Sequence, residues 1–260
     1  GAKVPAEGAS FEGAQYSVYS DEKCTKEIDI ITTNASGYGK SKELPFDVYY
    51  VKETKRPNGY ELDPTVYQID MKVSDQLAVY PVTSKEQVIR KPVELQKYDK
   101  ETGKPAPNNS AVKFAGAQYT IYKDKACTRQ VEILTLNDAG YAKSTGLLPG
   151  TYYIKETKAP TGYEADTLVH EVTVADDGQK SYQIQSYDPV IRGSLMLMKF
   201  LDDRYDESTL QEWIDRGELL GIRFTLTHED PSVPEKEIIT DQYGYAATKT
   251  QELVYGTWTL

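Results

Sequence analysis

The side chains that most often carry catalytic chemistry are few in this sequence and lie far apart. Two cysteines, Cys24 and Cys127, and two histidines, His170 and His228, are present in 260 residues. No serine, cysteine and histidine combine into the nucleophile, base and orienting group that a hydrolytic enzyme needs. We therefore predict that the protein is not an enzyme, and we expect both histidines at the surface.

The candidates for a disulfide or a metal site have the wrong spacing. Cys24 and Cys127 occupy the same position in two copies of a repeat, and equivalent positions in separate domains rarely lie close enough to pair. Two inert thiols near strand ends are expected instead of a disulfide framework or a zinc site. The acidic residues at 202–207 lack the Asp-x-Asp-x-Asp-Gly spacing of a dedicated calcium loop. We expect neither a metal nor a cofactor.

Charge and hydropathy argue against two classes of partner. The chain has 40 acidic and 30 basic residues, a formal net charge of -10, which repels a phosphate backbone. No apolar stretch approaches the ~18 residues of a membrane span, and residues 1–10 lack the basic and apolar regions of a signal peptide. We expect no nucleic-acid partner and no membrane span, with targeting and anchoring segments outside this sequence.

The sequence repeats itself at an offset of 103 residues. Residues 11–62 align without a gap with residues 114–165, and 27 of these 52 positions are identical. A repeat of this length is a whole domain rather than a turn of a solenoid. A third copy begins at Gly221 and stops at Leu260 before its last strands. We predict three domains, residues 1–90, 91–192 and 193–260, called here the first, second and third repeat. The first lacks its first strand.

Each repeat has the pattern of a β-sandwich. Short runs that alternate apolar and polar residues are separated by turn sequences such as Pro149-Gly150 and Asp177-Gly178, which predicts antiparallel strands. About seven strands in roughly 100 residues is typical of two packed sheets. One helix is expected at 208–217, with Ser208 as its N-cap. The repeats are joined almost without linkers, so we expect tandem all-β domains in an elongated rod.

Four stretches of the sequence resemble a known family. They are residues 93–103 (Val-Glu-Leu-Gln-Lys-Tyr-Asp-Lys-Glu-Thr-Gly), 116–122, 148–163 with its Glu-Thr-Lys-Ala-Pro-Thr-Gly-Tyr ending, and 187–193 (Tyr-Asp-Pro-Val-Ile-Arg-Gly). This pattern is similar to the Cna B-type, SpaA-like pilin domains of Gram-positive surface proteins. The resemblance implies an immunoglobulin-like or prealbumin-like sandwich. Many members form a spontaneous amide between a lysine on the first strand and an asparagine or aspartate on the last, assisted by a glutamate.

In the second repeat the resemblance assigns all three residues of this cross-link. Lys97 is the amine, Asp188 the acyl partner and Glu156 the assisting acid. Amide formation needs a neutral Lys97 and a protonated Asp188 at the same time, a combination that burial favours because desolvation disfavours both charged forms. Glu156 can polarise the Asp188 carbonyl and carry the proton to the leaving oxygen. The group reacts once per molecule, so this is maturation and not turnover.

The other two repeats match the pattern only in part. Glu53 is the equivalent of Glu156, but the matching lysine would precede residue 1. The position of Asp188 is taken by Glu86, since each lies 11 residues before the next lysine of the pattern. We therefore expect no cross-link in the first repeat. The third repeat retains Lys199, whose acid and acyl partners would lie past residue 260.

These inferences favour a structural function outside the cell. We predict the stalk of a cell-wall-anchored bacterial surface protein, stabilised by the Lys97–Asp188 amide, with the neighbouring domains of the same protein as its partners. Two alternatives remain open: a sortase-polymerised pilus shaft subunit, which needs a linking lysine motif and a sorting signal, and an adhesin domain that binds a host protein or glycan. Tyrosine-rich positions such as Tyr152-Tyr153 offer the second alternative no specific signature.

Overall fold

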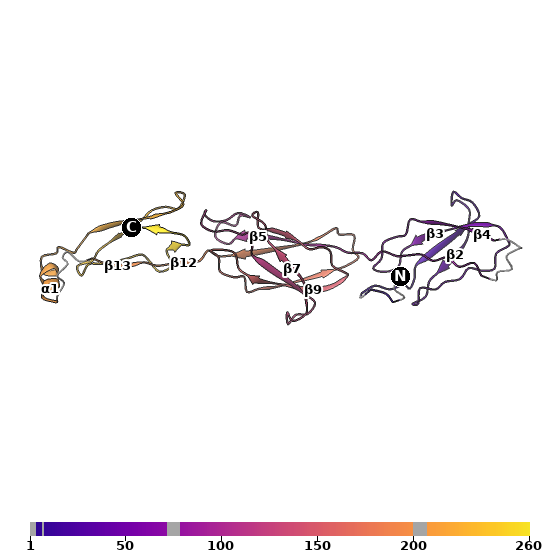
Figure 1. Cartoon of the computed structure of the whole chain (residues 1–260), viewed down its shortest axis with the longest axis horizontal. Coiled ribbons are helices and arrows are strands. Elements are labelled where there is room, and N and C mark those ends of the chain that lie inside the picture. Colours follow the sequence, from indigo (N-terminus) through magenta and orange to yellow (C-terminus); the bar gives the residue numbers. More distant parts are fainter. Residues whose placement is uncertain (1–3, 7, 72–78, 200–206) are drawn as a thin grey trace. The chain divides into compact units, whose positions relative to one another are not determined.

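The computed structural model describes residues 4–6, 8–71, 79–199 and 207–260, and its regular structure is almost entirely β (Figure 1). The chain divides into two compact units. Unit 1 comprises Gly1–Val93, Ser144–Tyr152 and Glu171–Tyr182, and unit 2 comprises Glu94–Lys143, Tyr153–His170 and Gln183–Leu260. The all-β fold predicted from the sequence is confirmed. The division at residues 90 and 192 stays a prediction.

The first repeat forms one four-stranded sheet of order β2-β1-β3-β4. Its strands are β1 (Gln15–Tyr19), β2 (Glu27–Thr32), β3 (Val48–Lys55) and β4 (Val66–Asp70). Val18, Tyr49 and Val51 form a buried apolar cluster on this sheet, and partly buried residues of β2 and β4 pack against them. Alternation along β1 and β3 directs these side chains to one face, where they form the core.

The second repeat has seven strands, the number that its sequence predicts. They are β5 (Val93–Asp99), β6 (Gln118–Tyr122), β7 (Gln130–Thr135), β8 (Tyr141–Lys143), β9 (Gly150–Lys158), β10 (Val169–Val174) and β11 (Tyr182–Asp188). One sheet has the order β10-β9-β6-β7, which is the sheet of the first repeat shifted by 103 residues. Even the register shift in the β1–β2 pair recurs at the same place in β6–β7.

The other sheet of the second repeat has the order β11-β5-β8. Three contacts join β5 to β11: Gln183 donates a hydrogen bond to Glu94, the ring of Tyr187 stacks on Tyr98, and the Lys100 amide donates to Asp188 O. Residue numbers rise together along the two strands in these contacts. The β5–β11 pair is therefore parallel, although the sequence pattern predicted antiparallel strands throughout. Alternation fixes the faces of strands but not their direction. In Figure 1 β5 lies on the opposite side of the sandwich from β9.

The third repeat contains small sheets and the single helix of the described chain. Its strands are β12 (Arg192–Gly193), β13 (Met196–Met198), β14 (Arg223–His228), β15 (Lys236–Ile239), β16 (Tyr245–Ala247), β17 (Leu253–Val254) and β18 (Trp258–Thr259). They pair as β12-β17, β13-β16 and β15-β14-β18. The buried residues Leu226, Ile238, Ala246 and Leu253 form their core.

The helix α1 (Glu207–Asp215) ends two residues before the predicted limit at Gly217. Gly217 has φ 69° and donates its amide to Ile214 O, while Glu218 donates to Trp213 O, which is the Schellman arrangement that glycine favours. The helix begins at Glu207, so Ser208 lies inside its first turn and is not the N-cap that the sequence predicted. The predicted acidic run at 202–206 lies outside the described residues.

One histidine prediction is wrong. His228 is buried, with 4% of its surface exposed, because the alternation of β14 points it inward together with Leu226. Its Nδ1 accepts a hydrogen bond from the Asp230 amide, and its Nε2 lies 3.2 Å from Tyr255 O. Both ring nitrogens thus have partners in a structural role. His170 is half-buried beside an aspartate described below.

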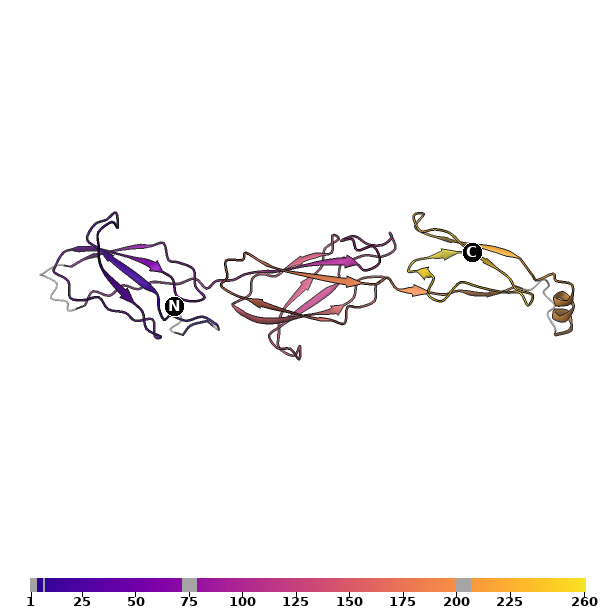
Figure 2. The same cartoon turned by 180° about the vertical axis from the view of Figure 1, so that it is seen from behind.

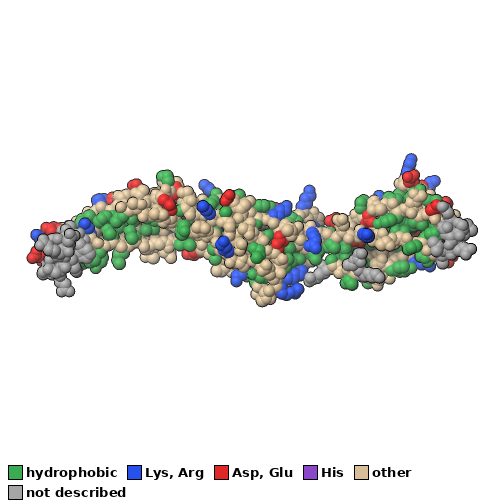
Figure 3. Space-filling view, in the orientation of Figure 1, with side chains coloured by type: hydrophobic (Ala, Val, Ile, Leu, Met, Phe, Trp, Pro, Cys, Tyr) green, Lys and Arg blue, Asp and Glu red, His purple; other side chains and the backbone are tan. Residues whose placement is uncertain are grey.

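Figure 2 shows the same strands from behind. The helix α1 has nine residues, and within the described residues no helix is long and apolar enough to cross a membrane. The face drawn in Figure 3 carries acidic and basic side chains interspersed with hydrophobic ones.

Candidate functional site: a buried lysine among carboxylates

Lys97 lies in the core of the second repeat with no exposed surface. The β5 strand buries every second residue, and Lys97 takes the inward position after Val93 and Leu95. Its amide donates to Gly140 O at 2.8 Å. A Cβ at Gly140 would lie 2.7 Å from the Phe114 ring and 3.1 Å from Lys97 Cβ, and Gly140 has φ 69°. Only glycine therefore allows the turn before β8 to pack this closely on the lysine.

The two predicted carboxylates meet this lysine. Lys97 Nζ lies 2.5 Å from Asp188 Oδ2 and 3.0 Å from Glu156 Oε1, and all three side chains have no exposed surface. Asp188 takes the last inward position of β11, and Glu156 an inward position of β9. Neither Asp188 oxygen accepts a hydrogen bond of normal geometry within the described residues. Its carboxyl group therefore faces Lys97 Nζ without competing donors.

Burial sets the charge state of Asp188. Desolvation raises the pKa of Asp188 to about 7, against the opposing effect of the Lys97 ammonium, and the negative charges of Glu156 and Asp166 raise it further. Leu95, Ile154 and Ile184, which lie on the same strands as Lys97, Glu156 and Asp188, are all buried. A protonated Asp188 is consequently accessible near neutral pH, which is the form that can act as an electrophile.

Sequence reasoning missed the hydroxyl groups around the lysine. Lys97 Nζ donates to Tyr119 Oη and, at 3.1 Å, to Ser186 Oγ, and these two hydroxyls lie 2.7 Å apart. Burial raises the pKa of Tyr119 strongly, so its phenol stays neutral. The signal was available: Tyr119 aligns with Tyr16, and Ser186 occupies the inward position two residues before Asp188.

Asp166 holds the assisting acid in place. Its amide donates to Glu156 Oε2 at 2.6 Å, and its carboxylate accepts from Ser186 Oγ at 2.8 Å and lies 3.1 Å from His170 Nε2. Desolvation would raise the pKa of Asp166, but hydrogen bonds from Leu168, Ser186 and His170 together lower it. Asp166 is thus an ionised anchor that leaves Glu156 Oε1 directed at Lys97.

The first repeat has the same acids without a described lysine. Glu53 is 1% exposed, and its Oε2 accepts the Asp63 amide at 2.6 Å. Glu86 Oε1 accepts from Tyr16 Oη at 2.7 Å and from Ser84 Oγ at 3.0 Å. Desolvation raises the pKa of Glu53 to about 7, opposed by the Asp63 amide and reinforced by Glu86. Glu86 is therefore near enough to Glu53 to act on its charge state.

Lys199 gives no comparable site. It follows β13, is half-buried, and its amide donates to Gly244 O at 2.8 Å. Cys24 and Cys127 both remain free thiols in equivalent turns, with φ of 53° and 55°. Among the described residues no group of three or more histidine, cysteine or acidic side chains is arranged to hold a metal.

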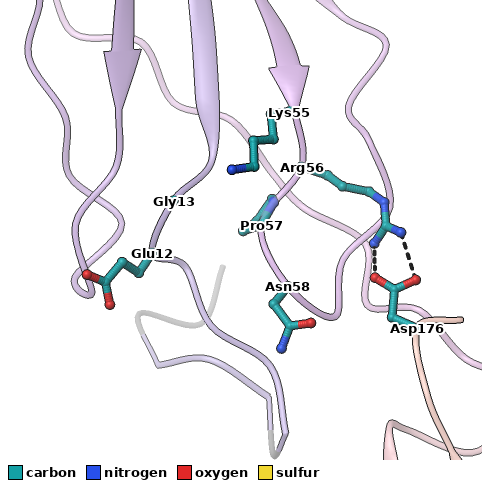
Figure 4. A pocket seen from close by; sticks show the side chains of 7 residues that line it. All are labelled: Glu12, Gly13, Lys55, Arg56, Pro57, Asn58 and Asp176. Atoms are coloured by element: carbon teal, nitrogen blue, oxygen red, sulfur yellow. Dashed lines mark hydrogen bonds and ion pairs between the residues drawn. The ribbon is translucent and has the colours of Figure 1, made fainter.

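A surface pocket in unit 1 is lined by several charged side chains, two of which form an ion pair with each other (Figure 4). The Arg56 guanidinium makes a two-pronged ion pair with the Asp176 carboxylate, with Nη2 to Oδ1 at 2.7 Å. Arg56 lowers the pKa of Asp176 as its main electrostatic partner. The pocket is lined by Glu12, Gly13, Lys55, Arg56, Pro57, Asn58 and Asp176.

The chain belongs to the SpaA family of prealbumin-like fold domains, which matches residues 2–86 and 91–188. This membership covers most of the first two repeats, including Lys97, Glu156 and Asp188, and it confirms the class of fold that the sequence predicted. The third repeat lies outside the matched residues.

This chain is also similar to individual proteins, of which it covers less than half the length in the first two cases below. The trypsin-resistant surface T6 protein of Streptococcus pyogenes serotype M6 is 42% identical over 57 residues, 22% of this chain and 10% of that protein. The Bacillus anthracis TIE protein has a similar structure, with a TM-score of 0.66 and 25% identity over 95% of this chain and 41% of that one. A streptococcal ancillary pilin aligns over 98% of this chain with a TM-score of 0.35 and 16% identity.

Proposed function

We propose that this chain is part of the stalk of a cell-wall-anchored Gram-positive surface protein, and that its second repeat locks itself with an amide between Lys97 and Asp188. The observation that supports this proposal is the contact of Lys97 Nζ with Asp188 Oδ2 at 2.5 Å in a site with no exposed surface. The SpaA membership and the surface protein among its relatives agree with this location.

The bond forms by loss of one water molecule. The lone pair of neutral Lys97 Nζ attacks Asp188 Cγ, and the nitrogen loses a proton as one Asp188 oxygen leaves with two. Glu156 Oε1, 3.0 Å from Nζ, relays that proton. No oxidant or cofactor enters the balance. Positioning supplies much of the rate, because well-oriented intramolecular reactions reach effective molarities of about 10⁵–10⁸ M.

A bond at this place suits a load-bearing element. β5 is the first strand of the repeat and β11 the last, and they are parallel neighbours. Force that enters at one strand can leave through the other across the amide. The bond closes a loop from residue 97 to residue 188, and by analogy with a disulfide it disfavours the unfolded chain by about 4–5 kcal/mol. An amide also resists reductants.

Intact mass spectrometry of the full chain tests the bond. We expect the mass to be lower than the sequence mass by one water, and digestion to yield a branched peptide that joins Lys97 to Asp188. Lys97→Met and Glu156→Gln should restore the unshifted mass, the second by slowing the reaction about 10²-fold or more. Lys100→Met, an exposed lysine just after β5, serves as the matched control. An unshifted wild-type mass would refute the cross-link.

Pulling the full chain by its ends tests the stalk role separately. With the amide present, residues 98–187 lie outside the loaded path, so the second repeat should show no unfolding step. Lys97→Met should add one step with the contour length of the released loop. A wild-type chain that carries the bond but still extends through residues 98–187 would argue against a load-bearing function and leave adhesion as the better explanation.

A further inference from the structure

Two loops of the third repeat contact the second repeat, and both lie within unit 2. In the loop after β14, the Asp230 carboxylate accepts the Ser110 amide at 2.5 Å. In the turn between β17 and β18, the Tyr255 amide donates to Ile191 O at 2.9 Å. The Tyr255 ring also packs on Gly162 so closely that a Cβ at this glycine would come within 2.7 Å of the ring. The joint between the two repeats therefore includes both loops.

The buried His228 ring connects these two loops. Its Nδ1 accepts the Asp230 amide at 2.9 Å, and its Nε2 lies 3.2 Å from Tyr255 O. A carbonyl oxygen can only accept, so Nε2 carries the proton and Nδ1 the lone pair, which is one neutral tautomer of histidine. The ring has little room to turn, because it lies edge-on to Trp258 with centroids 4.9 Å apart and faces Gly256, where a Cβ would overlap Nε2.

Protonation of the ring removes one of these two hydrogen bonds. An imidazolium has two N–H donors and no acceptor, so the buried amide of Asp230 would face another donor. A buried donor without an acceptor is costly, and the loop after β14 has to move to satisfy it. The contact is therefore present at neutral pH and lost as the pH falls through the range in which histidine ordinarily titrates, around pH 6–7.

Two carboxylates lie on the loop beside the ring, and both already accept backbone amides. Glu229 Oε1 accepts the Thr257 amide at 2.8 Å, and Asp230 accepts the Ser110 amide described above. The turn between β17 and β18 and the strand β18 contain no charged residue, and their one titratable side chain is the Tyr255 phenol. Neither carboxylate can therefore pair with an imidazolium without releasing an amide.

We propose that His228 is a pH-sensitive latch between the second and third repeats, closed while its imidazole is neutral and open once the ring is protonated. At neutral pH one ring holds both loops against the second repeat. In acid the Asp230 amide loses its acceptor, the loop after β14 moves, and the hydrogen bond from Ser110 to Asp230 is lost with it. The joint then becomes a hinge. This inference depends neither on the Lys97–Asp188 amide nor on the stalk function.

Hydrogen exchange of the full chain tests the latch, followed amide by amide by NMR at a series of pH values between about 7.5 and about 5. After correction for intrinsic exchange rates, protection of the Ser110, Asp230 and Tyr255 amides should fall about tenfold or more towards the acid end. Amides of β6 and β9 should keep their protection. Hydrogen bonds from Ser110 and Ser232 lower the pKa of Asp230, so its carboxylate stays ionised throughout this range.

Two matched variants and one further measurement assign the effect to this ring. His228→Gln retains a donor and an acceptor but cannot be protonated, so it should remove the pH dependence. His170→Gln, at the other histidine of the chain, should retain it. In the wild-type chain the NMR titration of the His228 ring should have the same midpoint as the loss of Ser110 protection, a comparison that needs no variant. Protection that is independent of pH, a different midpoint, or an unchanged pH dependence in His228→Gln would each overturn the proposal.

Discussion

The first and second repeats have equivalent four-stranded sheets, and each has a glutamate and a tyrosine at its core. Among the described residues, however, only the second has a lysine between two buried carboxylates. In the second, Lys97 lies between Glu156 and Asp188 and every strand has its neighbours. In the first, Glu53 and Glu86 each have one buried carboxylate oxygen without a hydrogen-bond partner among the described residues. The difference teaches that the assisting acid does not make the site. The strand that brings the lysine does, because it supplies the charge, the apolar cover and the centre of the second sheet together.

Removing the lysine should make the second repeat resemble the first, with the largest effect on stability. Lys97→Met prevents the cross-link, worth about 4–5 kcal/mol, and leaves two buried carboxylates without their cation. We expect the second repeat to unfold at much lower denaturant, while exchange protection of β1–β4 stays constant. Lys100→Met is the control. Equal unfolding of wild type and Lys97→Met would show that the lysine contributes no lock.

The two cores should differ in sensitivity to the same truncation. Phe114 has no exposed surface and packs on Tyr163 with ring centroids 5.2 Å apart, whereas its counterpart Phe11 is partly exposed and stacks on Tyr60 at 5.4 Å. Phe114→Ala should cost about 3–5 kcal/mol. We expect Phe11→Ala to cost clearly less in denaturant titrations followed by hydrogen exchange. Equal costs would contradict the open core of the first repeat.

The unpaired acid of the first repeat should make its stability fall as pH rises. The pKa of Glu53 is about 7 in the folded protein, above the ordinary value of 4.5, so the folded state binds the proton more tightly. Stability from this group is present at low pH and decreases between about pH 4.5 and 7, by on the order of 1–3 kcal/mol.

Glu53→Gln should remove most of this slope, and Glu61→Gln should retain it. Denaturation of the first repeat at about pH 5 and about pH 8 measures the difference. A slope that persists unchanged in Glu53→Gln would assign it to other groups.

The smallest effect is expected at the surface ion pair. Arg56 pairs with Asp176, and the second repeat has Ala159 at the position equivalent to Arg56. Both side chains are partly exposed, so Arg56→Ala should cost less than about 1 kcal/mol and the cost should shrink in high salt. A salt-independent loss of several kcal/mol would show that Arg56 acts through packing instead.

Much of this architecture could be predicted from the sequence because it is periodic. The family resemblance pointed to Lys97 and Asp188, and both are buried on the inward faces of their strands together with Leu95 and Ile184. The 103-residue offset predicted that β1–β4 would recur as β6, β7, β9 and β10. One helix was expected at 208–217, and the structure has it at Glu207–Asp215.

The sequence by itself determined which residue types face the core and which of them are acids or amines. Only the tertiary structure decided which of these residues are in contact. It shows that β5 and β11 run in parallel, that Tyr119 and Ser186 both accept hydrogen bonds from the lysine, and that Asp166 orients Glu156. It also shows that His228 is buried. The physical reason is range. A period of two is set by neighbouring residues along one strand, whereas strand direction and these hydrogen bonds join segments tens of residues apart, where sequence alternation carries no information.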